Sequence, residues 1–219
     1  NFIGYSPTDF DGNKHYTLFT EYYPKKYLYD LITKNTKDKS LTNTDIQIIL
    51  VGISRGMLFL HKNKRIHRDL KDTNILIDND LHPKISGFTS STHLEDDQML
   101  DLHIGSALYM APEVINGKYD FKADVYSFSI LMFKILTGKD PIIGENTANR
   151  HFKQVLKGCR PIFEIVLKDS IQEMVEKCWS EDPDERFTFE EIFNKLAFDK
   201  EYLLDGVDTE KLNSYINSI

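Results

Sequence analysis

Residues 66–74 read Ile-His-Arg-Asp-Leu-Lys-Asp-Thr-Asn, and residues 86–89 read Ser-Gly-Phe-Thr. The first stretch brings a carboxylate, an ammonium and an amide side chain close together in a segment with no regular apolar pattern. Catalytic groups commonly lie in such irregular segments. The second stretch has a glycine and no charged side chain.

The composition is that of an ordinary globular chain. Of the 219 residues, 41% are hydrophobic and 28% are charged, and the formal net charge is −7. This length allows one large domain or two small ones. No apolar run approaches the roughly 18 residues that a membrane span requires, and the acidic balance argues against nucleic-acid binding, which needs clustered Lys and Arg. The two cysteines, Cys159 and Cys178, lack metal-ligand spacing and predict reduced thiols in a cytoplasmic protein.

The first part of the sequence predicts a hairpin followed by a helix. Strand-like runs at residues 2–5 and 15–23 flank a turn-rich stretch at residues 6–13. Thr42 and Asp45 then fit a capping box, in which each side chain accepts from an unpaired amide of the first helical turn. Apolar residues follow at steps of three and four, which predicts a helix with one face in the core.

The later part of the sequence predicts further helices. Residues 124–137 are apolar on nearly all sides, so this helix should be buried throughout and end at Gly138. Residues 170–179 and 188–196 are amphipathic, whereas residues 148–155 form either a substrate-docking helix or an ordinary surface helix. The last residues form a weak helix or a loose tail. The pattern therefore predicts mostly one helical domain with a fragment of sheet in front.

The two opening stretches carry a resemblance. Residues 66–74 resemble the catalytic loop of protein kinases, H-R-D-L-K-x-x-N, and residues 86–89 stand where that family carries its D-F-G tripeptide. Other segments resemble, in the right order, the strand that enters the hinge, the end of the activation segment, the start of the central helix and the C-W-x-x-D-P-x-x-R segment, at residues 18–23, 105–113, 124–128 and 178–186. The last two resemble the tyrosine-kinase-like group of Ser/Thr kinases.

The resemblance implies an α+β, protein-kinase-like fold, with a mainly α-helical large lobe and a remnant of the small-lobe β-sheet and hinge. It assigns residues 1–198 to a kinase-like domain, of which residues 1–23 are the small-lobe and hinge remnant and residues 24–198 the large lobe. Residues 199–219 are then a C-terminal tail. The Gly-rich loop and the ATP-binding lysine would precede Asn1, and no G-x-G-x-x-G occurs in the chain. The sequence thus predicts a fragment of a catalytic domain.

The resemblance also assigns roles to the catalytic loop. Asp69 would accept the proton of the substrate hydroxyl, and Lys71 would place a positive charge against the transferring phosphoryl group. Asn74 offers a carbonyl oxygen, a suitable hard ligand for a second Mg²⁺. The implied cofactors are ATP and Mg²⁺, and the implied partner is a protein substrate. Glu21, Tyr23 and Leu76 would contact the nucleotide.

Position 87 departs from the family pattern. The aspartate of the D-F-G tripeptide bridges metal and phosphates, whereas Gly87 has no side chain and Ser86 beside it has only a neutral hydroxyl. One strong electrostatic contact is worth about 10²–10³ in rate. We therefore expect phosphate transfer by this chain to be reduced by several powers of ten.

Other residues are expected to be structural. By resemblance, His67 and Phe88 belong to a stacked apolar column that couples the lobes, and Asp124 accepts hydrogen bonds from the backbone of the catalytic loop. Glu113 and Arg186 should form a buried ion pair that stabilises the large lobe.

The activation segment is expected to carry Arg68 and Ser106. Arg68 would pair with a phosphorylated residue, for which the candidates lie at residues 90–92. The acidic run at residues 95–97 would either occupy Arg68 without phosphate or be a solvated charge run. Ser106 lies in a Gly-Ser-x-x-Tyr segment which, like Lys71, resembles the Ser/Thr kinases more than the tyrosine kinases.

Three functions remain open from the sequence. The chain is part of a Ser/Thr protein kinase that acts in signalling, a pseudokinase that binds or scaffolds a partner protein, or a truncated product with no folded role. Gly87 favours the pseudokinase, and the unbroken catalytic loop favours the enzyme.

Overall fold

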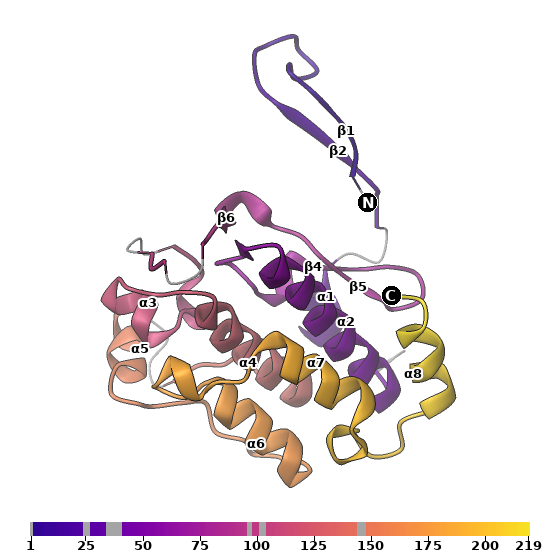
Figure 1. The fold of residues 1–219 in the computed structure, drawn as a ribbon, viewed down its shortest axis with the longest axis vertical. Helices are drawn as coiled ribbons and strands as arrows, with labels where there is room; N and C mark the ends of the chain where they lie inside the picture. The colour runs from indigo at the N-terminus through magenta and orange to yellow at the C-terminus, as the bar shows by residue number, and fades with distance from the viewer. Residues whose placement is uncertain (1, 24–26, 34–40, 96–97, 101–103, 144–147) are drawn as a thin grey trace.

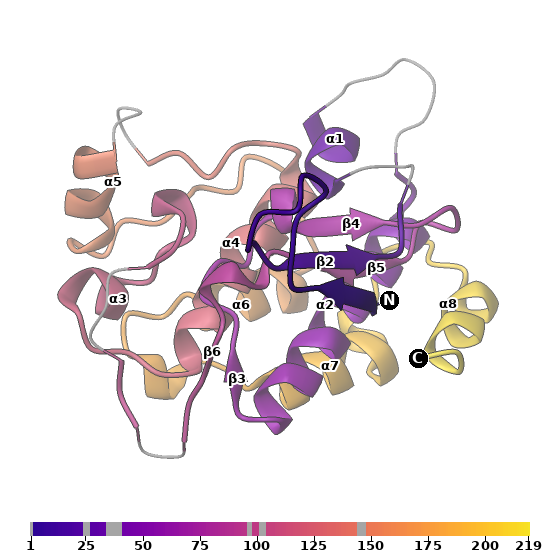
Figure 2. The ribbon, with the colours of Figure 1, turned by 90° about the horizontal axis from the view of Figure 1, so that it is seen from above.

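The structure is a computed structural model that describes residues 2–23, 27–33, 41–95, 98–100, 104–143 and 148–219. A two-stranded hairpin stands apart from a helical body (Figure 1). Its strands, β1 (Phe2–Ser6) and β2 (Thr17–Thr20), are antiparallel, and among the described residues they pair only with each other. Seen from above, the hairpin lies over strands β4 and β5 of the body (Figure 2). The predicted hairpin and the predicted helical domain are both confirmed.

The body consists of helices joined by short strands and single 3₁₀ turns. Its helices are α1 (Leu28–Thr33), α2 (Asn43–Lys62), α3 (Pro112–Asn116), α4 (Lys122–Thr137), α5 (Ala148–Val155), α6 (Asp169–Cys178), α7 (Phe189–Phe198) and α8 (Thr209–Ile216). The short strands form antiparallel pairs, β3 (Arg65–Ile66) with β6 (Thr92–His93), and β4 (Ile75–Ile77) with β5 (Pro83–Ile85). The 3₁₀ turns are η1 (Asp72–Asn74), η2 (Phe88–Ser90), η3 (Ala107–Tyr109), η4 (Pro183–Glu185) and η5 (Lys200–Tyr202). In the described part of the chain, no helix is long and apolar enough to cross a membrane.

Helices α2 and α4 carry the core. The capping box at Thr42 and Asp45 forms as predicted and starts α2, whose apolar face is buried against α7. Helix α4 is buried almost along its whole length, and Gly138, with φ of 68°, ends it in the left-handed conformation. The predicted helices at residues 170–179 and 188–196 are also present, as α6 and α7.

Strand β5 lies directly on α2 because α2 carries glycines there. A Cβ atom at Gly52 would come within 2.5 Å of Pro83 Cγ, and one at Gly56 within 2.7 Å of Ile85 Cδ1. Larger residues would push the hairpin of β4 and β5 away from α2. These glycines therefore allow β4 and β5, the strands that follow the catalytic loop, to lie close to α2.

The C-terminal residues form a packed helix and not a loose tail. Helix α8 buries Leu212 and Tyr215 against the body, and the ring of Tyr215 packs against His82 with centroids 4.4 Å apart. Lys211 Nζ lies 2.8 Å from an Asp45 carboxylate oxygen in the first turn of α2. The sequence left both forms open because the charged residues of this segment hide its short apolar face.

A stacked aromatic group closes the lower part of the body. Trp179 is the single tryptophan of the chain. It follows α6, is 6% exposed and stacks on Phe163 with ring centroids 5.8 Å apart. Phe133 of α4 lies 6.2 Å from the indole ring, so Trp179 links α6 to the central helix.

Candidate active site

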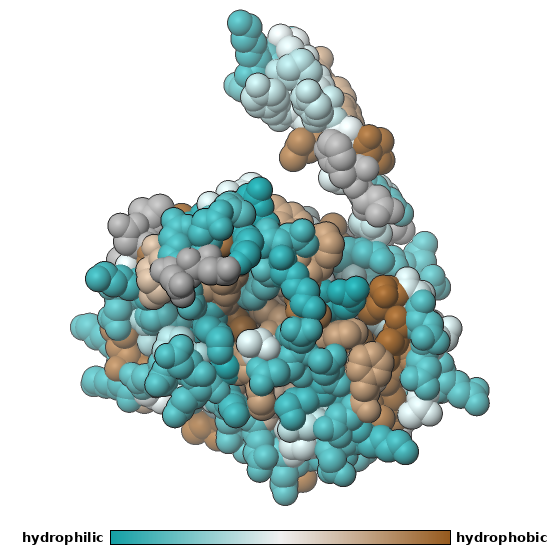
Figure 3. All heavy atoms as spheres, viewed as in Figure 1, coloured by the Kyte–Doolittle hydropathy of each residue, from teal (hydrophilic) through white to brown (hydrophobic). Residues whose placement is uncertain are grey.

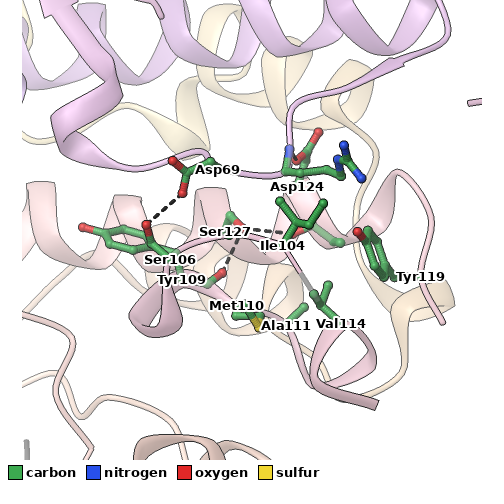
Figure 4. A pocket seen from close by; sticks show the side chains of 13 residues that line it. Asp69, Ile104, Ser106, Tyr109, Met110, Ala111, Val114, Tyr119, Asp124 and Ser127 are labelled. Atoms are coloured by element: carbon green, nitrogen blue, oxygen red, sulfur yellow. Dashed lines mark hydrogen bonds between the residues drawn. The ribbon is translucent and has the colours of Figure 1, made fainter. Parts of the chain in front are cut away.

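The catalytic loop runs between β3 and β4, and Asp69 lies at its centre. The Ser106 hydroxyl donates to Asp69 Oδ1 (2.8 Å), and the Lys71 ammonium lies 3.0 Å from Asp69 Oδ2. Lys71 also donates to Ser106 Oγ (2.6 Å). Figure 4 shows Ser106 pointing at Asp69 from the segment below. The structure thus brings a carboxylate, an ammonium and a serine hydroxyl into one hydrogen-bonded group.

Asn74 closes this group from the other side. Its side-chain amide donates to Asp69 Oδ2 (2.8 Å) and to the Asp69 carbonyl (2.7 Å). Ser86 is tied to the same residue, because its backbone N–H and its hydroxyl both donate to the Asn74 carbonyl. The catalytic loop and the segment at residues 86–89 are therefore held together at Asn74.

Gly87 lies against the Asn74 amide with no room for a side chain. Its φ is +79°, a left-handed conformation that glycine adopts readily. A Cβ atom here would lie 2.6 Å from both Asn74 Nδ2 and Asn74 Oδ1. The amide of Asn74 thus fills the space that a side chain at position 87 would need.

The oxygen donors of this site do not fit the family's magnesium site. Mg²⁺ prefers carboxylate and other hard oxygen ligands. Here Gly87 contributes none, the Ser86 hydroxyl is turned to a carbonyl, and both Asp69 carboxylate oxygens already accept from Ser106, Lys71 or Asn74. Among the described residues of this site, the oxygen that remains available to a metal is Asn74 Oδ1, which carries no charge.

A cavity of about 850 Å³ lies between the hairpin and the body. Glu21, Tyr23 and Leu76, the residues predicted to contact a nucleotide, all line it together with Gly87 and Phe88. Tyr23 donates to a Glu21 carboxylate oxygen (3.0 Å), and partial burial together with this hydrogen bond raises the pKa of the Tyr23 phenol. In the space-filling view, hydrophobic residues reach the surface at the lower end of the hairpin (Figure 3).

His67 joins the catalytic loop to the segment at residues 86–89. Its ring packs against Phe88 with centroids 5.2 Å apart, and its Nε2 donates to the Ser86 carbonyl (2.9 Å). The Asp69 backbone N–H donates to His67 Nδ1 (3.2 Å), which sets the tautomer. His67 is fully buried, whereas Phe88 is 48% exposed and faces the cavity.

Asp124 holds the backbone of the catalytic loop. It is fully buried at the start of α4 and accepts from the N–H groups of His67 (2.8 Å) and Arg68 (2.9 Å). His61 Nε2 lies 2.9 Å from the same carboxylate, a contact that sequence analysis missed. Burial alone would raise the pKa of Asp124, but the hydrogen bonds that its carboxylate accepts from His61 and from the His67 backbone outweigh burial and lower it.

Asp124→Asn is expected to lower the free energy of unfolding by about 2–3 kcal/mol at pH 7, because an amide nitrogen would then face a backbone donor. The folded pKa of Asp124 lies below its usual value of 3.8. The stability that the lowered pKa contributes is therefore fully present above pH 3.8 and is lost as the pH falls through the pKa of Asp124 in the folded protein. Urea unfolding of both proteins at pH 7 and at pH 3 measures this difference.

Glu164→Gln is the control, because Glu164 is a surface carboxylate whose pKa is lowered by Lys139. It should change stability little at either pH. The lowered pKa of Asp124 would be contradicted if the difference in free energy of unfolding between wild type and Asp124→Asn were the same at pH 7 and at pH 3.

Arg68 lies in a strained position and contacts backbone. Its φ is +67°, which is uncommon for a residue with a side chain. Its Nε donates to the Ser90 carbonyl (2.5 Å). Glu95 pairs with His93 (2.7 Å), and residues 96–97 lie outside the described residues. Arg68 thus reaches the segment predicted to be phosphorylated, through a main-chain atom.

Glu113 and Arg186 form a bidentate ion pair. Arg186 Nη1 lies 2.5 Å from Glu113 Oε1, and Nη2 lies 2.9 Å from Oε2. The Arg186 side chain is completely buried and also donates to the carbonyls of Ser180 (2.9 Å) and Lys122 (3.1 Å). The pair therefore ties α3 and the start of α4 to the segment after α6.

Comparison with known proteins identifies the family. The pattern that defines the protein kinase domain matches residues 5–198. A probable serine/threonine-protein kinase of Dictyostelium discoideum is 35% identical over 82% of this chain and 14% of its own length. Serine/threonine-protein kinase STY17 of Arabidopsis thaliana is 33% identical over 82% of this chain and 31% of its own length, and the serine/threonine/tyrosine-protein kinase HT1 of the same plant is 31% identical over 88% and 49%.

The chain thus spans half or less of the length of these relatives. On the match over residues 5–198 and these similarities, the chain belongs to the protein kinase family.

Proposed function

We propose that this chain is part of a Ser/Thr protein kinase domain in which transfer of the γ-phosphoryl group of ATP to a protein hydroxyl is strongly impaired. The observation that carries the proposal is the contact of Gly87 with Asn74. A complete Asp69 group supports descent from an enzyme, while the lack of a carboxylate at position 87 supports a low rate.

The residues of the Asp69 group would still contribute to the reaction. Asp69 would accept the proton of the substrate hydroxyl, which would replace Ser106 on Oδ1. Lys71 would place its ammonium beside the attacking oxygen and the phosphoryl oxygens. Mg²⁺, when bound in relatives of this family, neutralises charge on the phosphates. That contribution is the one this site supports least.

A second candidate function is a pseudokinase that binds a partner protein. Two features favour it. The close contact of Asn74 with Gly87 fills the place of a metal ligand without a metal, and the large cavity leaves room for a segment of a partner protein. We also propose a cytoplasmic location, which the free thiols of Cys159 and Cys178 support.

The test is transfer of labelled phosphate from Mg·ATP to a generic protein substrate by the full-length protein. We expect the wild type to transfer no more phosphate than Asp69→Asn. Phosphate transfer that is clearly above background in the wild type and disappears in Asp69→Asn would overturn the proposal that the activity is impaired.

Thermal unfolding with ATP separates the two candidates. A rise in Tm that requires Mg²⁺ favours an impaired enzyme, because the metal then binds together with the nucleotide. No rise with ATP, with or without Mg²⁺, favours the binding module.

A further inference from the structure

Lys134 is a charged residue inside the most buried helix of the chain. It lies in the last turn of α4 and is 4% exposed. A buried ammonium is costly unless it is paired with an opposite charge. The groups that contact the Lys134 ammonium therefore indicate the role of this residue.

Two carboxylates lie at equal distance from Lys134. Its Nζ is 2.6 Å from Asp72 Oδ2 and 2.6 Å from Asp140 Oδ1. It also lies over the ring of Tyr29 in α1, 4.9 Å from the centroid. One ammonium thus connects α4 with the catalytic loop, the segment after α4, and α1.

Asp72 depends on this ammonium more than Asp140 does. Asp72 is buried, and its Oδ1 accepts from the Thr73 backbone N–H (2.8 Å). Asp72 Oδ2 lies 2.6 Å from the Lys134 ammonium, and the Tyr109 phenol is a further, uncharged hydrogen-bond partner of the Asp72 carboxylate. Within the part of the chain that the structure describes, Lys134 is thus the cation that compensates the charge of Asp72. The carboxylate of Asp140, in contrast, is 52% exposed to water.

Asp72 lies between the two functional residues of the loop, Lys71 and Asn74. It begins η1, where the Asn74 N–H donates to the Lys71 carbonyl (3.0 Å) and the Ile75 N–H donates to the Asp72 carbonyl. Movement of Asp72 towards solvent would break this turn. It would also pull Asn74 away from Asp69 and Gly87.

We propose that Lys134 is a positioning residue: it clamps Asp72 and so holds the turn that carries Lys71 and Asn74 onto α4. The importance of this clamp for phosphate transfer rests on the proposed function. The clamp itself is a property of the folded chain and is testable without turnover.

Amide hydrogen exchange in the full chain tests the clamp. Lys134→Met keeps the length and the apolar stem but leaves Asp72 as an unpaired buried charge. We expect exchange at the amides of Asn74 and Ile75 to become at least about tenfold faster, while α2 and α7 keep their protection. Asp72→Asn combined with Lys134→Met removes the unpaired charge but does not restore the clamp, so exchange should be slower than in Lys134→Met and still faster than in the wild type.

Two further variants keep the test decisive. Asp72→Asn alone cuts the same contact but leaves Lys134 paired with Asp140, so faster exchange at Asn74 is still measurable if Lys134→Met does not fold. Asp140→Asn, which leaves the Asp72 contact in place, should not change exchange at Asn74. Unchanged exchange at Asn74 in Asp72→Asn, an equal increase throughout the body in Lys134→Met, or no recovery in the double variant would overturn the proposal. None of these outcomes depends on whether the wild type transfers phosphate.

Discussion

Replacing Arg186 with methionine is expected to lower the free energy of unfolding by about 3–5 kcal/mol, the usual effect of breaking a buried pair by removing one partner. The guanidinium is fully buried and bidentate to Glu113, so the carboxylate would lose its counter-charge. The carbonyls of Ser180 and Lys122 would lose a donor as well. Urea unfolding of the two proteins at neutral pH measures the difference.

Lys62→Met is the matched control for this variant. Lys62 and Glu190 also form an ion pair, at 2.8 Å, but each side chain is 57% exposed. Water and salt screen such a pair, so its loss should change stability by less than about 1 kcal/mol. If Arg186→Met and Lys62→Met reduce stability equally, the buried pair is not what ties the helices together. Adding Glu113→Gln to Arg186→Met should restore part of the loss.

Gly87→Asp is expected to lower the stability of the metal-free protein and to raise the rate of phosphate transfer with Mg·ATP. Without metal it should lower stability by about 1–3 kcal/mol, because a side chain at φ of +79° is strained and must displace the Asn74 amide. With Mg·ATP, the new carboxylate adds the hard oxygen ligand that the site lacks. Phosphate transfer by the full-length protein should then rise about 10²–10³-fold.

Gly87→Ala separates the carboxylate from the crowding. It places the same Cβ atom against Asn74, so it should reduce stability in a similar way. It brings no oxygen, so the gain in rate with Mg·ATP should not appear. Equal behaviour of the two variants with Mg·ATP would show that position 87 is not what limits the rate.

Most of the fold was predictable because its signals are local. The capping box at Thr42 and the apolar run of α4 each lie within a few turns of one helix, and the structure confirms them. The packing of α8 was not predictable, because it depends on Tyr215 meeting His82 and Lys211 meeting Asp45 across the fold.

The candidate site divides in the same way. Asp69, Lys71 and Asn74 lie in one short segment, so their proximity followed from the sequence. The hydrogen bond between His61 and Asp124 joins positions far apart in the chain, so no pattern in the sequence predicted it. Lys134 did leave a signal, since a charge inside an otherwise apolar helix needs a partner, but nothing in the sequence named Asp72.

The aromatic stack on α6 has a practical consequence for all these measurements. Because Trp179 is the single tryptophan, its fluorescence is an intrinsic reporter of one place in the molecule. Arg186 binds the carbonyl of the next residue, Ser180. Unfolding of the Arg186→Met variant is therefore observable by emission spectra without any added dye, whereas opening of the catalytic loop alone should leave the spectrum unchanged.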